Sequence, residues 1–203
     1  MILCLTGPMA AGKNAAQTIF EQKGFAAVDA DELAHSAVEN KEKEIIAAFS
    51  PEAAAAGIRL LNRDGTLDRR NLGKLIFRKQ ELIARQEALV HPEINRLLEK
   101  FIANHEKSDI VLNATVLYKV PAVRRCDAVV YIDAPWLLRF FRVRFRDKMP
   151  ALQIFARFRS QTKLYTKYKK LNADIYRVWN TGNLHKLERN IDSVLHQCRQ
   201  RGF

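Results

Sequence analysis

The fold is decided by residues 2–14, which read Ile2-Leu3-Cys4-Leu5-Thr6-Gly7-Pro8-Met9-Ala10-Ala11-Gly12-Lys13-Asn14. A short apolar run stops at Gly7, and the spacing Gly-x-x-x-x-Gly-Lys then leads into a helix-forming segment. This order predicts a strand, a phosphate-binding loop and a helix. A plain strand, turn and helix with a chance lysine is the weaker interpretation, because the whole spacing directly follows an N-terminal strand.

Such a loop binds an anion through successive backbone N–H groups and through the positive end of the next helix. Gly12 lets the backbone approach closely, and Lys13 brings a point charge to the outer phosphates. Asn14 stands where Ser or Thr usually binds the Mg²⁺ of the nucleotide, and its amide oxygen can take a metal or its water. The predicted phosphate-binding residues are Gly7, Pro8, Met9, Ala10, Ala11, Gly12, Lys13 and Asn14, with Asn14 as the metal ligand.

Size and composition restrict the class of protein. The 203 residues suit one domain of ordinary size with room for a small inserted lobe, and the apolar content of 48% excludes general disorder. No apolar run approaches a membrane span and no signal pattern opens the chain, so we expect a cytoplasmic protein without a membrane partner. Cys4, Cys126 and Cys198 are odd in number and far apart, which favours buried thiols over disulfides or zinc.

Positive charge is concentrated in one window. The formal net charge is +12, and residues 139–170 hold eleven Lys or Arg against one acid, Asp147. This window therefore carries +10 and the other 171 residues carry +2. A local positive field of this kind indicates a polyanionic partner such as a nucleotide or a nucleic acid.

Two carboxylates follow the second predicted strand. A helix is expected from Ala15 to Lys23, then a short buried strand at 25–28, then Asp29 and Asp31 at the carboxyl end of that strand. Ligands bind at this edge of open α/β sheets. One carboxylate can orient the loop or cap a helix from Glu32, while the other acts as a general base for a hydroxyl.

Residues 41–107 predict helices without a convincing strand, interrupted at Ser50-Pro51, at 62–65 and at His91-Pro92. Such a segment indicates a helical insertion between strands. Arg70, at the start of one helix, can present a guanidinium to phosphate, although a solvated helix start is an equal alternative. His91 fits a helix boundary with an inward imidazole, a position that is more often structural than catalytic.

Two further buried strands are predicted at 109–113 and 128–133, because continuous apolar runs are typical of central parallel strands. A helix after Pro135 places Arg139, Arg142 and Arg146 on one face. After Pro150 a second basic helix carries Arg157, Arg159 and Lys163, and the pair is typical of a mobile lid over phosphates. The last strand is expected at 174–179, a turn at 180–183 and a closing helix at 184–198.

Motifs of one family are spread over almost the whole chain in the family's order. They are Leu5-Thr6-Gly7 with Gly12-Lys13, Asp29-Ala30-Asp31 with Ala34, Asp64-Gly65 with Leu67-Asp68-Arg69-Arg70 and Leu72, His91-Pro92 with Ile94, Asp133-Ala134-Pro135, Arg142 with Arg146-Asp147, Ala156-Arg157 with Gln161, and Asn180 with Gly182. Together they resemble the dephospho-coenzyme A kinases, which share the fold of nucleoside monophosphate kinases. The phosphate loop alone is common to many nucleotide enzymes, whereas the other motifs are more specific.

The resemblance implies an α/β, three-layer P-loop kinase fold with a parallel sheet of about five strands, a helical substrate-binding insertion and a basic helical lid. One unit would span residues 1–203, with a core of 1–38, 108–138 and 172–203, an insertion at about 39–107 and a lid at about 139–171. The implied reaction moves the γ-phosphoryl of ATP, with Mg²⁺, to the ribose 3′-hydroxyl of dephospho-coenzyme A. The implied roles are catalysis for Lys13, Asp31 and Arg142, nucleotide binding for Arg146, Arg157 and Asn180, and acceptor binding for Asp31, Arg70 and His91.

Asn14, Asn113, Thr115 and Lys119 depart from the family pattern, which usually has a hydroxyl at the first position and Asp, Pro and Glu at the others. An active enzyme with rearranged Mg²⁺ coordination is favoured over a degenerate one, because Lys13, Asp31 and the lid arginines are retained. The alternatives are another small-molecule kinase of this fold and a module that binds nucleic acid through the aromatic and basic residues of 139–170. We expect a monomer or a small homo-oligomer, with nucleic acid as the disfavoured partner.

Overall fold

The computed structural model describes residues 1–171 and 173–203, so the first residue of the predicted core segment 172–203 lies outside the described residues. The chain divides into two compact units. One comprises Met1–Asp31 with Phe101–Phe203, and the other comprises Glu32–Lys100.

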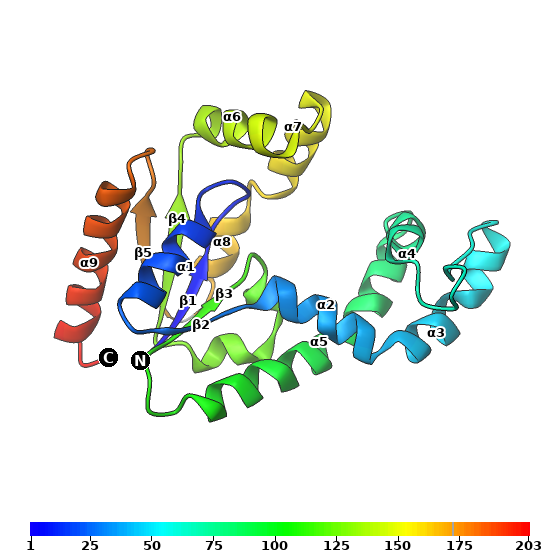
Figure 1. The fold of residues 1–203 in the computed structure, drawn as a ribbon, viewed down its shortest axis with the longest axis horizontal. Coiled ribbons are helices and arrows are strands. Elements are labelled where there is room, and N and C mark those ends of the chain that lie inside the picture. The colour runs from blue at the N-terminus through cyan, green and yellow to red at the C-terminus, as the bar shows by residue number, and fades with distance from the viewer. Residues whose placement is uncertain (172) are drawn as a thin grey trace. The chain divides into compact units, whose positions relative to one another are not determined.

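The larger unit is built on a five-stranded parallel sheet in the order β2-β3-β1-β4-β5 (Figure 1). The strands are β1 Ile2–Thr6, β2 Ala26–Asp29, β3 Ile110–Asn113, β4 Ala128–Asp133 and β5 Asp174–Trp179. β3 and β4 are buried along their whole length, as their continuous apolar runs predict. The predicted α/β fold with about five parallel strands is therefore confirmed.

β2 differs from its prediction, because its residues are only half-buried. It lies at an edge of the sheet, and among the described residues β3 is its one partner strand, so the other side of its backbone has no neighbouring strand there. The aromatic anchor of this region is Phe25, which precedes the strand and packs edge-to-face on Phe20.

Two helices, α1 Lys13–Gln22 and α9 Leu184–Gln200, pack together against the sheet (Figure 1). Leu3 and Leu5 of β1 join Phe20 of α1 and Ile191 of α9 in one buried apolar cluster. Side chains alternate along a strand, so Cys4 points to the other face of the sheet. There it lies beside Tyr168 of α8 Leu164–Lys169, and burial raises the pKa of both groups.

The basic segment forms three helices, α6 Trp136–Asp147, α7 Ala151–Ser160 and α8. Lys163 was predicted on the second basic helix, but that helix ends at Ser160 and Lys163 precedes α8. The two short 3₁₀ helices Leu117–Lys119 and Pro121–Arg125 connect β3 to β4.

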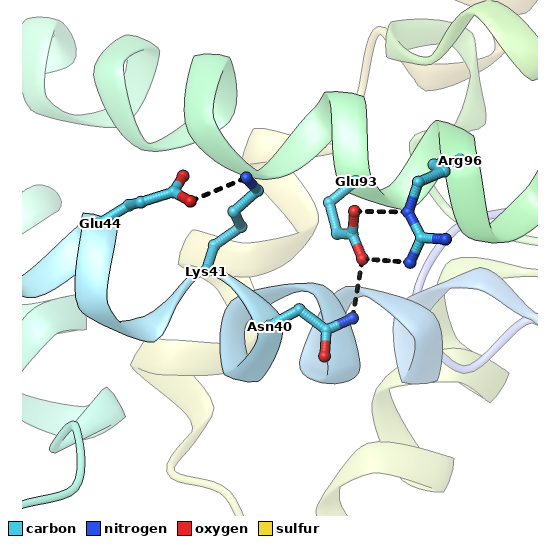
Figure 2. Close-up of polar contacts among 5 residues, drawn as sticks. All are labelled: Asn40, Lys41, Glu44, Glu93 and Arg96. Carbon is cyan, nitrogen blue, oxygen red and sulfur yellow. Dashed lines mark hydrogen bonds and ion pairs between the residues drawn. The ribbon is translucent and has the colours of Figure 1, made fainter.

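The smaller unit is helical, with most of α2 Ala30–Asn40, then α3 Glu42–Ala55, α4 Arg69–Ile76 and most of α5 Gln80–Asn104. Figure 2 shows Glu93 of α5 accepting hydrogen bonds from Asn40, at 2.7 Å, and from Arg96, at 2.7 and 2.8 Å. The bonds from Arg96 and Asn40 lower the pKa of Glu93 to about 2, so this buried carboxylate stays charged.

The predicted breaks at Ser50-Pro51 and His91-Pro92 are wrong, because α3 and α5 run through both prolines. A proline inside a helix removes one backbone hydrogen bond, and its ring clashes with the carbonyl of the preceding turn. Burial of apolar side chains on both sides of the proline offsets that cost, since α3 buries Phe49 and Ala53, and α5 buries Val90 and Ile94. The helix start predicted at Arg70 is confirmed to within one residue, because α4 begins at Arg69 after Asp68, whose carboxylate accepts the N–H of Asn71 at 2.9 Å.

Candidate active site

The phosphate loop joins β1 to α1, and its two glycines are required by close contacts. A Cβ at Gly7 would lie 2.1 Å from the backbone oxygen of Ile132, and one at Gly12 would lie 2.1 Å from Nδ2 of Asn180. Gly12 also has a φ of 103° and begins α1 without a side-chain cap. The first N–H groups of α1 are therefore left for an anion.

The carbonyl groups of the loop are held from the other side by Asn180 and Arg142. Asn180 Nδ2 donates to Ala11 O at 2.9 Å, and Arg142 Nη1 donates to Ala10 O at 3.1 Å and to Ala11 O at 3.3 Å. Arg142 Nη2 also reaches Asn180 Oδ1 at 3.3 Å. Burial lowers the pKa of Arg142 from its ordinary value. Arg142 and Asn180, both predicted site residues, thus bind the loop backbone and hold the carbonyl groups of Ala10 and Ala11 on their own side of the loop.

A cavity of about 480 Å³ lies at the open side of the loop. Lys13, Arg146 and Arg157 supply three cations to its wall, and the remaining lining residues are Met9, Ala10, Gly12, Asn14, Ala15, Thr115, Ser160 and Gln161. Burial lowers the pKa of Lys13, and Arg146 adds to that effect. Asp31 and Asp29 act in the opposite direction, which places both carboxylates near the Lys13 ammonium.

The three cations differ in how they are paired. Arg146 Nε donates to Asp147 at 2.7 Å, and this contact lowers the pKa of Asp147. Arg157 is exposed, and no carboxylate among the described residues forms an ion pair with it. Its guanidinium remains accessible to an incoming anion.

Asp29 and Asp31 have separate environments. Asp29 Oδ1 accepts the N–H of Asp31 at 2.8 Å and so caps the start of α2, as one of the predicted alternatives requires. Because of this cap α2 begins at Ala30, two residues before the predicted Glu32. Asp31 is exposed, and its carboxylate accepts the hydroxyl of Thr115 at the long distance of 3.4 Å.

Asn113 at the end of β3 is buried beside Asp29. Its Nδ2 donates to Gln17 Oε1 at 2.8 Å and approaches Asp29 Oδ2 at 3.5 Å. Its Oδ1 is buried and accepts no hydrogen bond within the described part of the chain. This leaves a neutral oxygen where the family usually has an acid.

A second cavity of about 420 Å³ adjoins the first, since both include Ala10, Gly12, Ala15 and Arg146 in their walls. Its other lining residues are largely apolar and are Arg142, Phe145, Asn180, Gly182, Leu184 and Leu187. An apolar chamber joined to a cationic one suits a base attached to phosphates.

Gln161 is a site residue that was expected only as part of a motif. Its Oε1 accepts the N–H of Met9 at 2.8 Å, so the turn after α7 is joined to the phosphate loop. The two residues are 152 positions apart, and no local pattern indicates that contact.

Arg70 and His91 belong to the smaller unit. Arg70 is exposed at the start of α4, while its neighbour Arg69 forms an ion pair with Glu39. His91 is half-buried in the middle of α5 and not at a helix boundary. Their predicted role toward the acceptor stays a prediction.

Comparison with known proteins identifies the family. The model of the dephospho-CoA kinase family matches residues 1–185. A dephospho-CoA kinase of Treponema denticola is 36% identical, and the match covers 100% of this chain and 91% of the relative. The chain belongs to the dephospho-CoA kinase family.

Solved structures agree with this assignment. A crystal structure from Thermus thermophilus superposes with a TM-score of 0.81 at 31% identity, covering 97% of each chain. The dephospho-CoA kinase from Campylobacter jejuni has a TM-score of 0.63 at 26% identity, covering 97% of this chain and 96% of that one. Kinase activity in the last step of coenzyme A synthesis, predicted from the motifs, is thereby confirmed, as is the P-loop kinase fold.

Membership of the dephospho-CoA kinase family implies ATP as phosphoryl donor and a small molecule as acceptor. No helix within residues 1–171 and 173–203 is both long and apolar enough to cross a membrane.

Proposed function

We propose that the phosphoryl group passes from ATP to the ribose 3′-hydroxyl of dephospho-coenzyme A in the cavity lined by Lys13, Arg146 and Arg157. The observation that carries this proposal is the convergence of three cations and an uncapped helix N-terminus on one cavity, with the Asp31 carboxylate close to Lys13. Phosphoryl transfer needs mainly positioning and neutralisation of charge, which this arrangement supplies.

ATP binds with its phosphates at the amide side of the loop and its base in the adjoining apolar cavity. Lys13 contacts the outer phosphates, and the first N–H groups of α1 contact the inner ones. Arg142 and Asn180 support binding indirectly, because their bonds to Ala10 and Ala11 keep the carbonyls away from the phosphates. Arg157 and Arg146 neutralise charge on the transferring group when the basic segment closes as a lid.

Asp31 accepts the proton of the attacking hydroxyl. Its carboxylate is exposed, so it is accessible to a substrate. Asp29 is not suited to this role, because one of its oxygens already caps α2. We assign acceptor binding to Arg70 and His91, which both belong to the smaller unit.

The chain's oxygen donors fit a Mg²⁺ ion that is held mainly by the nucleotide. Within residues 1–171 and 173–203 no cluster of three His, Cys, Asp or Glu forms a metal cage. Mg²⁺ is commonly held by few protein ligands together with phosphates and water. Asn14 lines the phosphate cavity, and Asn113, whose Nδ2 lies 3.5 Å from Asp29 Oδ2, has an Oδ1 that accepts no hydrogen bond within the described residues. When bound, Mg²⁺ neutralises phosphate charge.

The test is an ADP-release assay with mass analysis of the product. ADP release should require both ATP and dephospho-coenzyme A, and the product should carry one added phosphate on its ribose. Release of ADP with another acceptor and none with dephospho-coenzyme A would reject the proposal. We further propose that the protein acts in the cytoplasm as a monomer or small homo-oligomer, which light scattering can test for the oligomer.

A further inference from the structure

A third cavity of the larger unit, of about 460 Å³, lies against the phosphate loop at Pro8. It is lined from β4, β5, α6, α7 and α8, and it shares Gln161 with the phosphate cavity. Its volume is in the range of pockets that hold small molecules. Nothing in the proposed reaction uses it.

The charges of this cavity favour an anion. Its wall has three guanidinium groups, from Arg139, Arg159 and Arg177, against the single carboxylate of Asp133. Asp133 is already bonded, since Oδ2 accepts Arg177 Nε at 3.0 Å and Oδ1 accepts the N–H of Ala134 at 2.8 Å. No carboxylate within the described residues pairs with Arg159, so two positive charges remain uncompensated.

Two of these arginines are held in place by aromatic rings. The Arg139 guanidinium lies 4.5 Å from the centroid of Phe158, and Nε donates to Ala134 O at 3.2 Å. Arg177 lies over Tyr165 at 5.3 Å. Oriented guanidinium groups of this kind lose little freedom when they bind a phosphate, which favours binding.

The wall also offers exposed aromatic faces. Trp136 is 53% exposed and Phe155 is 49% exposed, although both line a cavity of a folded domain. Trp136 opens α6, whose first turn has no acid and no side-chain cap. Tyr131 is buried at the floor, and burial raises its pKa to about 12, so its hydroxyl keeps the proton and can donate.

Aromatic faces beside unpaired arginines are suited to a flat ring that carries an anion. We propose that this cavity is a second nucleotide-binding site, distinct from the phosphate loop, in which the ring stacks on Trp136 and Phe155 and the phosphates bind Arg139 and Arg159. Its occupant is a free adenine nucleotide such as ADP, bound in addition to the donor and the acceptor of the reaction. Gln161 lines this cavity and also accepts a hydrogen bond from Met9 of the phosphate loop, so a single side chain would separate the ligand from the loop.

The two tryptophans of the chain allow a direct test. In the double variant Lys13→Ala with Trp179→Phe, Trp136 is the single fluorophore and the phosphate loop is impaired. Titration with ADP should quench Trp136 to saturation. Adding Arg159→Glu should raise the apparent Kd at least tenfold, while the matched exposed control on α9, Arg189→Glu, should leave it unchanged. Circular dichroism establishes that each variant is folded.

Three further ligands test which groups of the nucleotide the site recognises. Adenosine and pyrophosphate should each bind more weakly than ADP, because each lacks one of the two recognised groups. Dephospho-coenzyme A in the same titration should bind more weakly than ADP, and tighter binding would make the cavity part of the acceptor site and overturn the proposal. The test measures binding in a variant without Lys13, so a failure of the proposed reaction would not affect it. Absence of quenching, or an equal apparent Kd for ADP with and without Arg159→Glu, would overturn the second site.

Discussion

The two sides of the phosphate loop use similar residues in opposite ways. Behind the loop, Arg142 is half-buried and binds backbone carbonyls, whereas in front of it Arg157 is exposed and forms no ion pair within residues 1–171 and 173–203. Asp29 and Asp31 repeat the contrast, since the first caps a helix and the second faces solvent. Residues that look equivalent in the sequence therefore divide into those that hold the site and those left accessible to reactants.

The largest difference between two variants is expected for the carboxylates Asp31 and Asp29. Asp31→Asn should lower turnover by about 10²–10⁴, the usual loss on removing a general base, with ATP binding nearly unchanged. Turnover and the affinity for a fluorescent ATP analogue measure the two effects. Asp29→Ala is the matched variant, and it should cost about 0.5–2 kcal/mol of stability through the lost cap. If Asp31→Asn keeps near-normal turnover, Asp31 has no part in proton transfer.

The exposed arginine should affect rate more than stability. Arg157→Ala should lower kcat by about 10²–10³, since a positioned donor to the transferring group is lost, while Tm stays unchanged. Single-turnover rates and thermal melts measure this. A lowered Tm with a normal rate would mean that Arg157 has a structural role.

The buried arginine should show the reverse balance. The family resemblance implied catalysis for Arg142 as a residue of the lid, but its bonds to Ala10 and Ala11 give it a structural part. Arg142→Ala should cost about 1–3 kcal/mol of stability, the usual cost of losing charged hydrogen bonds, and should weaken ATP binding. Urea unfolding measures the first effect. Unchanged stability would contradict the role behind the loop.

Two glutamates of the smaller unit, Glu93 and Glu44, should differ in how strongly they make the stability of the protein depend on pH. The lowered pKa of Glu93, about 2 against an ordinary 4.5, means that its stabilisation is complete above pH 4.5 and is lost as the pH falls toward 2. Glu93→Gln should therefore reduce the loss of stability between about pH 5 and pH 3. The control is Glu44→Gln, because Glu44 is exposed in its pair with Lys41 (Figure 2) and should change little. Equal pH profiles in the two variants would disprove the assignment.

The smallest effect is expected at Asn14. If its amide oxygen binds Mg²⁺ less well than a hydroxyl does, Asn14→Ser should lower the Mg²⁺ concentration for half-maximal nucleotide binding several-fold. Binding of a fluorescent nucleotide at graded Mg²⁺ measures it. A Mg²⁺ requirement that stays the same or rises would indicate that the metal is held elsewhere.

The sequence by itself determined the strands, the phosphate loop and the family. These depend on signals within a few residues of one another, such as the glycine spacing of 7–12 and the apolar runs of β3 and β4. It failed at Pro51 and Pro92, where a local rule for ending helices was overridden by burial on both sides of the proline. Local chemistry decides an element only when packing does not oppose it.

Only the tertiary structure decided which polar groups hold the site. Arg142 and Ala10 are 132 positions apart, Gln161 and Met9 are 152 apart, and Asn180 and Ala11 are 169 apart. The parallel sheet brings these segments to one edge, and each contact depends on hydrogen-bond distances of about 3 Å. Residue type alone does not encode such distances. An arginine side chain binds a carbonyl or stays exposed to solvent according to which groups the fold places beside it.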